Sequence, residues 1–186
     1  MTTGPTPTPG QTVGPFFHYA LPFPGDRDLV APGSTGAVRL HGTVRDGGGA
    51  PVPDALVEIW QADSQGRVPG KSGSFRRDGH TFTGFGRAST DRAGDYTFTT
   101  VLPGRVDGGL PFFSVVVFAR GLLDRLFTRA YLPLDGAAPD RLLTSLGSRA
   151  ELLVVRPGDD GLRFDITLQG HDETPFLAYP RHSCSH

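Results

Sequence analysis

The feature that most constrains the fold is the stretch of residues 110–132, LPFFSVVVFARGLLDRLFTRAYL, the most apolar part of the sequence. Two runs within it, residues 112–118 and 126–132, are rich in the β-branched and aromatic residues that favour strands. They flank a turn at residues 120–121, and a segment rich in turn residues, 103–109, precedes them. We therefore predict two buried strands that follow a loop beside the core, where functional sites often lie.

Further strands are predicted by shorter patterns of period two. Apolar and polar residues alternate in residues 38–45, 95–101 and 162–169, and the last of these is the most regular. Residues 55–61 carry apolar side chains on both faces, so we expect this strand to be covered on both sides for part of its length. In the first segment His41 falls on the polar face, and we expect its side chain to be solvated.

The remaining segments predict little regular structure. Residues 139–147 have Pro near one end and Gly at the other, which is typical of a short helix, and residues 152–155 predict a brief strand. Residues 62–92 form a long irregular region, which in a compact domain is usually functional. Short strands separated by turns, with one short helix, indicate an all-β fold, an antiparallel β-sandwich with long loops.

The chain is expected to divide into an extended N-terminal arm at residues 1–36, the sandwich at residues 37–170 and a C-terminal tail at residues 171–186. The arm holds an aromatic cluster at residues 16–19, which we expect to dock either on its own domain or on a partner. The tail alternates His and Cys at residues 182–186, which suits a transition metal, but a frayed end is the preferred interpretation.

Composition excludes several classes of function. The 18 basic and 19 acidic residues nearly balance and form no basic stripe, so nucleic-acid binding has no support. No apolar run approaches the length of a membrane span, and the N-terminal residues lack the pattern of a signal peptide. The single Cys184 cannot form an internal disulfide, which favours the reducing cytoplasm. No nucleophile motif or phosphate-binding loop is present either.

An ordered set of short fragments points to a specific family. The fragments are residues 12–17 (TVGPFF), 57–63 (VEIWQAD), 66–67, 85–87, 90–91, 94, 100–104, 118–123 (FARGLL), 128–131, 163–166 and 169–170. In this order they resemble the intradiol ring-cleaving dioxygenases, and more closely the non-metal chain of the heteromeric enzymes of that family. Each fragment alone is weak, but the set is specific and covers most of the chain.

The resemblance implies a ferric centre with two tyrosinate and two histidine ligands in the catalytic chains of the family. The positions that correspond to the tyrosinates are Val68 and Val106, and those that correspond to the histidines are Phe112 and Ser114. A family arginine corresponds to Gly109. The resemblance therefore implies that this chain keeps the scaffold, has no catalytic residue of its own and holds no metal.

The resemblance also implies a partner and a reaction. A beta subunit would hold Fe(3+), pair with this alpha-type chain in a larger oligomer, and open the ring of 3,4-dihydroxybenzoate with O2 to give 3-carboxy-cis,cis-muconate. The residues of this chain implied to contact substrate at the partner's iron site are Thr12, Gly14, Pro15, Phe16 and Arg120. The arginine has an open alternative, a structural turn residue or an ion pair at the subunit interface.

Two other classes of function remain as alternatives. One is a non-catalytic carrier or interaction protein, since a β-sandwich alone does not fix function. The other is a stand-alone iron dioxygenase with relocated ligands drawn from the four tyrosines of the chain, Tyr19, Tyr96, Tyr131 and Tyr179.

Overall fold

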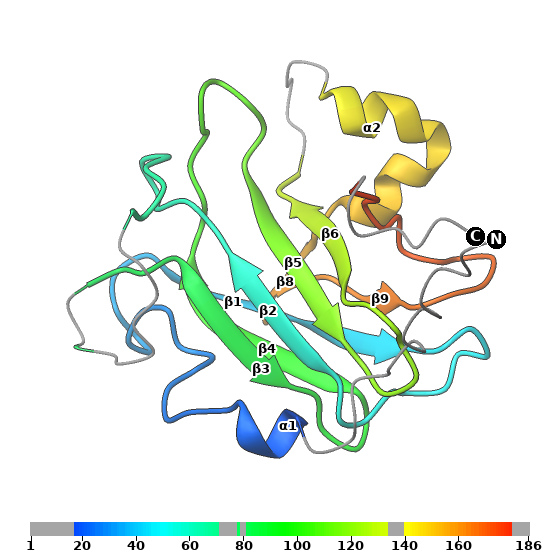
Figure 1. The fold of residues 1–186 in the computed structure, drawn as a ribbon. Coiled ribbons are helices and arrows are strands. Elements are labelled where there is room, and N and C mark those ends of the chain that lie inside the picture. Colours follow the sequence, from blue (N-terminus) through cyan, green and yellow to red (C-terminus); the bar gives the residue numbers. More distant parts are fainter. Residues whose placement is uncertain (1–16, 71–77, 79–80, 134–139, 180–186) are drawn as a thin grey trace, which may run out of the picture.

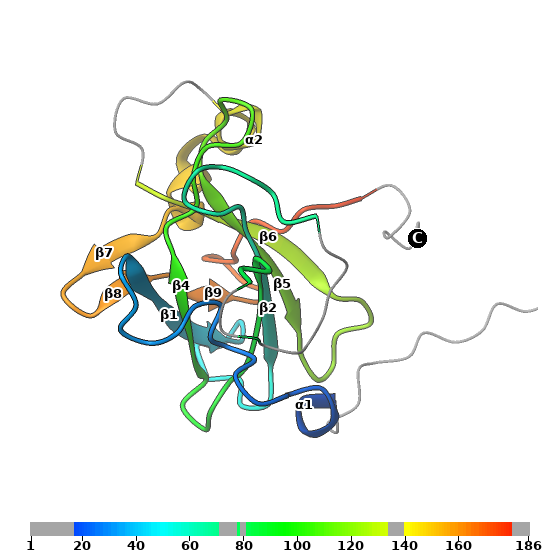
Figure 2. The same ribbon diagram turned by 90° about the vertical axis from the view of Figure 1, so that its left-hand side faces the viewer.

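The structure, a computed structural model, describes residues 17–70, 78, 81–133 and 140–179. These residues form two β-sheets packed face to face, which Figure 1 shows from the front and Figure 2 from the side. One sheet contains β1 (Ala37–Arg45), β4 (Asp95–Val101), β7 (Arg156–Gly158), β8 (Gly161–Arg163) and β9 (Ile166–Thr167). The other contains, in spatial order, β3 (Phe85–Ser89), β2 (Leu56–Trp60), β5 (Phe112–Phe118) and β6 (Leu126–Tyr131). The predicted all-β sandwich is confirmed.

The apolar stretch at residues 110–132 forms the antiparallel pair β5 and β6, as predicted. Phe113, Val115 and Val117 point inward from β5 and are almost fully buried. On its other edge β5 pairs with β2, so it lies inside its sheet with neighbours on both sides. This position explains why β5 needs apolar residues along most of its length.

The core lies between the two sheets and is built from the alternating positions that the sequence predicts. Phe98 and Ile166 enter it from the first sheet, and Val57 and Ile59 enter it from the second. All four side chains are fully buried. Burial of a side chain of this size stabilises the fold by roughly 1.5–3 kcal/mol relative to exposure, so this layer dominates the stability of the domain.

The predicted strand at residues 162–169 is interrupted in the structure. Phe164 and Ile166 face inward as expected, but β8 ends at Arg163 and β9 begins only at Ile166. In the gap, the Thr43 N–H of β1 donates to Asp165 Oδ1 at 3.0 Å, so a side-chain oxygen accepts where a strand carbonyl normally would. The predicted inward face is therefore correct, but the predicted single strand is two short strands, β8 and β9.

Three short helices complete the described part of the chain: α1 (Phe17–Ala20), α2 (Arg141–Leu146) and the 3₁₀ helix η1 (Gly147–Leu153). The predicted helix near residues 139–147 is confirmed as α2, where Asp140 accepts hydrogen bonds from the first turn and Gly147 follows the last. The brief strand predicted at residues 152–155 is reduced to a single β-bridge between Val154 and Tyr131. Leu153 instead ends η1 and packs with Tyr131 in a small second core.

The expectation for His41 is also wrong. Its side chain is buried, and its Nε2 atom lies 3.3 Å from Asp160 Oδ2 at the turn between β7 and β8. The alternating pattern of the strand predicted that His41 lies on the outer face of β1. In the structure β8 pairs with β1 at this position, and the turn that contains Asp160 lies against the imidazole ring. Burial from a segment more than one hundred residues away is not visible in a local pattern.

Segments on both sides of the sandwich pack against it. The Leu29 N–H donates to the Thr99 carbonyl of β4, and the Leu177 N–H donates to the Phe127 carbonyl of β6. Backbone hydrogen bonds thus fix the segment before β1 and the segment after β9 to the two sheets. The tail residues 182–186, for which a frayed end was preferred over a metal site, lie outside the described residues. Within the described ranges, no helix has the length and apolarity to cross a membrane.

Candidate functional site

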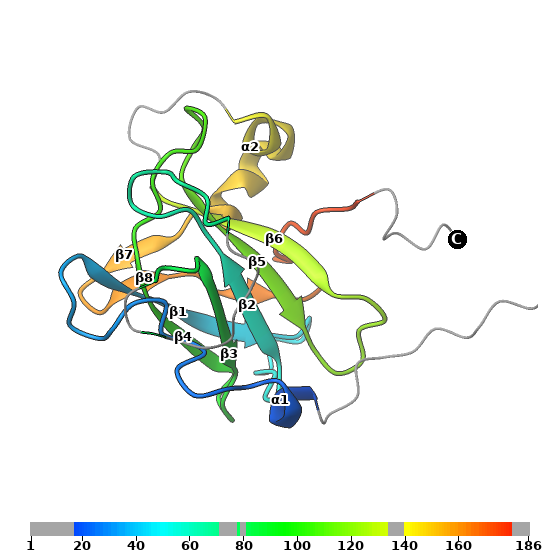
Figure 3. The ribbon, with the colours of Figure 1, turned by 60° about the vertical axis from the view of Figure 1, so that its left-hand side comes forward.

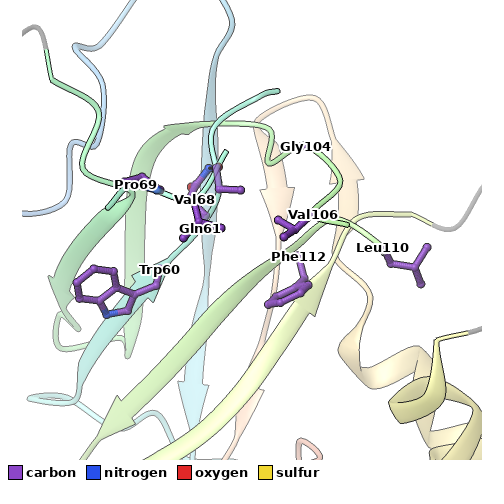
Figure 4. Close-up of a pocket in the computed structure, with 9 residues that line it drawn as sticks. Trp60, Gln61, Val68, Pro69, Gly104, Val106, Leu110 and Phe112 are labelled. Carbon is purple, nitrogen blue, oxygen red and sulfur yellow. Dashed lines mark hydrogen bonds between the residues drawn. The ribbon is translucent and has the colours of Figure 1, made fainter. Parts of the chain in front are cut away.

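A pocket of about 340 Å³ lies at the end of the second sheet where β2 finishes and β5 begins. Figure 4 shows its lining in close-up, and Figure 3 shows the loops above it. The lining comes from three segments of the chain: residues 60–62 at the end of β2, Val68 and Pro69 in the following loop, and Gly104, Val106, Leu110 and Phe112 before and at the start of β5.

Two glycines allow the loops over this pocket to touch. A Cβ atom on Gly66, whose φ is +81°, would lie 2.0 Å from the Arg105 carbonyl oxygen, and one on Gly104 would lie 2.4 Å from the Gly66 nitrogen. The Gly104 N–H donates to the Asp63 carbonyl at 2.8 Å. Because no side chain fits between these backbones, both positions require glycine.

Asp63 organises the first of these loops. Its carboxylate accepts hydrogen bonds from the backbone N–H groups of Gln65 and Arg67, both at 2.9 Å, and from Arg67 Nε at 2.8 Å. The hydrogen bond from the Arg67 backbone is the main cause that holds the pKa of Asp63 below its usual value. The turn at residues 63–67 is therefore stabilised by an ionised carboxylate and is fixed against the loop that contains Gly104.

The polar side chain in the lining is already satisfied. Gln61 Nε2 donates to the Val101 carbonyl at 2.9 Å and to the Ala62 carbonyl at 3.1 Å, and Gln61 Oε1 accepts from Thr100 Oγ1. The other lining side chains are apolar. Among the residues that the structure describes, the lining therefore offers apolar surface and two aromatic rings, those of Trp60 and Phe112, and no charged side chain.

The structure brings together three of the four positions at which the resemblance places family metal ligands. Val68, Val106 and Phe112 all line the pocket, and Ser114 follows Phe112 on the same face of β5, opposite Trp60. Valine and phenylalanine side chains have no donor atom, and a lone serine hydroxyl cannot replace phenolates and imidazoles. Among the residues that the structure describes, no group of three His, Cys, Asp or Glu side chains could hold a metal ion. The lining does not fit a ferric ion.

Two of the four tyrosines, Tyr96 and Tyr131, are engaged within the fold rather than available as relocated ligands. Tyr96 donates its hydroxyl proton to the Phe164 carbonyl at 2.5 Å, and burial raises its pKa strongly. Burial also raises the pKa of Tyr131, whose hydroxyl accepts from Arg129 Nη1 at 3.1 Å. These two phenols are held neutral, whereas a tyrosinate ligand must lose its proton.

Arg120 lies far from this pocket. It lies two residues beyond the end of β5, whereas Phe112 of the pocket begins that strand. Eight residues of extended chain span roughly 25 Å at about 3.3 Å per residue. Figure 1 shows the loop after β5 at the opposite end of the sheet from the pocket loops. Arg120 is exposed, and its Nη2 atom lies 3.6 Å from Asp54 Oδ2.

Asp54 was not identified from the sequence. Its φ is +64°, which is unusual for a residue with a side chain, and its Oδ1 atom is buried without a hydrogen-bond partner in the described part of the chain. Of the predicted substrate contacts, Arg120 is thus seen as an intrachain ion pair, and its contact with substrate stays a prediction. The other predicted contacts, Thr12, Gly14, Pro15 and Phe16, lie outside the described residues.

Comparisons with known proteins agree with this geometry. The family described as Dioxygenase matches residues 23–108. The protocatechuate 3,4-dioxygenase alpha chain of Burkholderia cepacia is 38% identical over 191 residues, covering 91% of this chain and 96% of that one. The beta chain from the same organism is 35% identical over 163 residues, covering 73% of this chain and 66% of that one. The dioxygenase domain of a carbohydrate-binding fusion from Streptomyces sp. SirexAA-E superposes with a TM-score of 0.56 at 26% identity, covering 89% of this chain and all of that one.

These similarities define the class of protein. The chain belongs to the intradiol ring-cleaving dioxygenase family. Within that family, the match over nearly the full length of both chains is with the alpha chains of protocatechuate 3,4-dioxygenase. The resemblance carried by the short sequence fragments is therefore confirmed at the level of family and chain type.

Proposed function

We propose that this chain is the non-iron-binding alpha subunit of a heteromeric intradiol dioxygenase. The assembled enzyme opens the ring of 3,4-dihydroxybenzoate (protocatechuate) with O2 between the two hydroxyl-bearing carbons and releases 3-carboxy-cis,cis-muconate. The observation that carries the proposal is the combination of a near full-length match to alpha chains with apolar side chains at Val68, Val106 and Phe112, where a catalytic chain needs ligands.

The partner in this proposal is a beta subunit that holds Fe(3+). Alpha and beta chains of protocatechuate 3,4-dioxygenase are both homologues of this chain, which implies an alpha/beta heteromer. The chemical step is assigned to the partner, because the described residues of the pocket include no ligand set for iron. The proposal therefore assigns this chain a part in shaping the partner's site and in excluding water from it.

Within the complex, the arm and the turn after β5 are the proposed contacts with substrate. Gly14 and Pro15 allow backbone to approach a flat ring, Phe16 offers an apolar edge, and Arg120 offers positive charge to the substrate carboxylate. The exposure of Arg120 supports this role, because a guanidinium at the surface can contact a molecule outside its own chain as well as Asp54.

The location is proposed to be cytoplasmic, which is supported by a single cysteine, Cys184, in the whole sequence. Family membership argues against the alternative of an unrelated carrier or interaction sandwich. The neutral, engaged phenols of Tyr96 and Tyr131 argue against a stand-alone enzyme with relocated ligands.

The proposal is tested by reconstitution of activity. The chain is purified alone and after co-expression with a beta-type chain, and O2 uptake with 3,4-dihydroxybenzoate is measured for both. We expect no ring cleavage by the chain alone and cleavage by a stable complex. Cleavage by the isolated chain, or a failure to form any complex with beta chains, contradicts the proposal.

The role of Arg120 is tested in the same complex by Arg120→Ala, with Arg125→Ala as a matched control at another exposed arginine of the same turn. Loss of a charge-assisted hydrogen bond of about 1.5–3 kcal/mol lowers kcat/KM for 3,4-dihydroxybenzoate by about 10- to 100-fold. Catechol, which has no carboxylate, should be much less affected. An equal loss for both substrates indicates a structural role and contradicts the substrate contact.

A further inference from the structure

The apolar pocket at the end of β2 has the size of a small-molecule site. Its volume of about 340 Å³ lies at the lower end of the range for ligand pockets, roughly 300–1,000 Å³. Apolar cavities of roughly 150 Å³ in proteins bind benzene, so this pocket has room for one aromatic ring with small substituents. The pocket is therefore large enough for a monocyclic aromatic molecule.

The walls of the pocket suit a flat, uncharged ring. Trp60 and Phe112 supply two aromatic surfaces, and Val68 and Val106 supply aliphatic contacts between them, as Figure 4 shows. Aromatic rings pack favourably on such surfaces in offset or edge-to-face arrangements. Val68 is 67% exposed and Trp60 is 44% exposed, so both contribute apolar surface that water still contacts.

The described walls offer few partners to polar and anionic molecules. The amide of Gln61 is engaged on both its oxygen and its nitrogen, so it cannot satisfy a hydroxyl or a carboxylate of a ligand without losing its own bonds. The Arg129 guanidinium lies 4.3 Å from the Phe112 ring centroid and donates to the Tyr131 hydroxyl. A carboxylate buried in this pocket would meet no cation in the described lining, which is costly.

We propose that this pocket is a binding site for a neutral, apolar, monocyclic aromatic molecule, of the class of toluene and the halobenzenes, and that it discriminates against dihydroxybenzoates. The inference goes beyond the proposed function, because it concerns a site in this chain rather than the partner's iron site. Binding here needs neither metal nor O2. The ligand is held by apolar contact with the side chains of Trp60, Phe112 and the two valines.

The probe is 4-fluorotoluene, followed by ¹⁹F NMR line broadening, with the full-length chain alone and in complex with its beta-type partner. Trp60 is the single tryptophan of the chain, so its fluorescence in the isolated chain reports directly on the same pocket. We expect saturable binding by both signals, and no change in the Trp60 emission on addition of 3,4-dihydroxybenzoate to the isolated chain.

Three variants locate the site. Val68→Asp places a carboxylate on the pocket wall at an exposed position, so it should fold normally and weaken 4-fluorotoluene binding by about tenfold. Leu123→Asp makes the same kind of change at a 61% exposed leucine outside the pocket lining and should leave binding unchanged. Val68→Ile, which keeps the wall apolar, should bind like the wild-type chain.

Three results overturn the proposal: no saturable binding, equal weakening by Val68→Asp and Leu123→Asp, or binding by the isolated chain that disappears in the complex. The last result means that a side chain of the partner occupies the pocket. Iron content and ring cleavage, measured on the same complex, report separately on the proposed function. Failure of the aromatic site is therefore distinguishable from failure of that proposal.

Discussion

The close approach of the two pocket loops makes Gly104→Ala the most informative single substitution. The added Cβ would lie 2.4 Å from the Gly66 nitrogen, 2.7 Å from the Ser64 carbonyl oxygen and 2.9 Å from the Gln65 carbonyl carbon. All three are backbone atoms, so no flexible side chain can move aside. Ordinary contact begins at about 3.4 Å, so the loops must separate by about 1 Å.

The cost can be worked out from two effects. Overpacking of this kind costs about 1–3 kcal/mol. Separation of the loops also stretches the 2.8 Å hydrogen bond from the Gly104 N–H to the Asp63 carbonyl, worth about 0.5–1.5 kcal/mol. Together they lower the free energy of unfolding by about 2–4 kcal/mol, which for a domain of this size lowers Tm by about 5–15 °C.

The measurement is urea and thermal unfolding followed by circular dichroism, with Gly70→Ala as the matched control. Gly70 lies near the same pocket, and an added Cβ there meets no atom within 4 Å. The control should change stability by less than about 1 kcal/mol. If Gly104→Ala and Gly70→Ala are equally stable, the loops do not touch as described and the geometry of the pocket is wrong.

Substitutions at three further positions test other parts of the structure. Tyr96→Phe leaves the Phe164 carbonyl without its hydroxyl donor and should cost about 1–2 kcal/mol in urea unfolding; an unchanged midpoint contradicts the bond. Burial raises the pKa of Asp165, but hydrogen bonds from Arg163 and the Thr43 N–H and the nearby positive charge outweigh burial and hold the pKa below its usual value. The ionised carboxylate therefore stabilises the fold at neutral pH, and this stabilisation is lost as the pH falls below about 4. Asp165→Asn should therefore lower stability by about 1 kcal/mol at pH 7, and an acid titration of unfolding should show the two proteins converging toward pH 3. Asp54 has a φ of +64°, so the Asp54→Gly variant should be about 1 kcal/mol more stable than the Asp54→Ala variant. Both variants lose the contact with Arg120, but only alanine keeps the backbone strain. Equal stability of the two variants in thermal unfolding refutes this.

Local sequence patterns were sufficient to predict the elements whose own residues determine their structure. β5 and β6 were predicted because their apolar residues identify the centre of a sheet, and α2 was predicted because Asp140 and Gly147 mark its ends. The alternation in residues 162–169 also gave the correct inward face. Patterns of this kind depend on near neighbours in the chain.

The misses have a common cause, which is contact between distant segments. His41 is buried by the turn that contains Asp160, and Asp165 replaces a ladder carbonyl for Thr43, about 120 residues away. A period-two pattern contains no information about which strand will lie alongside. The interruption between β8 and β9 therefore could not be read from the alternation itself.

The pocket was only partly predictable. Resemblance to the family pointed to Val68, Val106 and Phe112 as positions without ligands, and the structure brings them to one pocket. The part played by Trp60 was not found, since its strand pattern indicates only an alternating face. The turn glycines Gly66 and Gly104 were a usable signal, because two glycines in separate loops permit the close approach of backbones.

The distribution of iron between the chains tests the central claim most directly. The complex of this chain with a beta-type partner is purified, its iron is measured by elemental analysis, and the ratio of the chains is measured by quantitative amino-acid analysis. The absence of a ligand set around Val68, Val106 and Phe112 predicts one iron per alpha/beta pair and none in this chain alone. Two irons per pair, or stoichiometric iron in the isolated chain, contradicts the account.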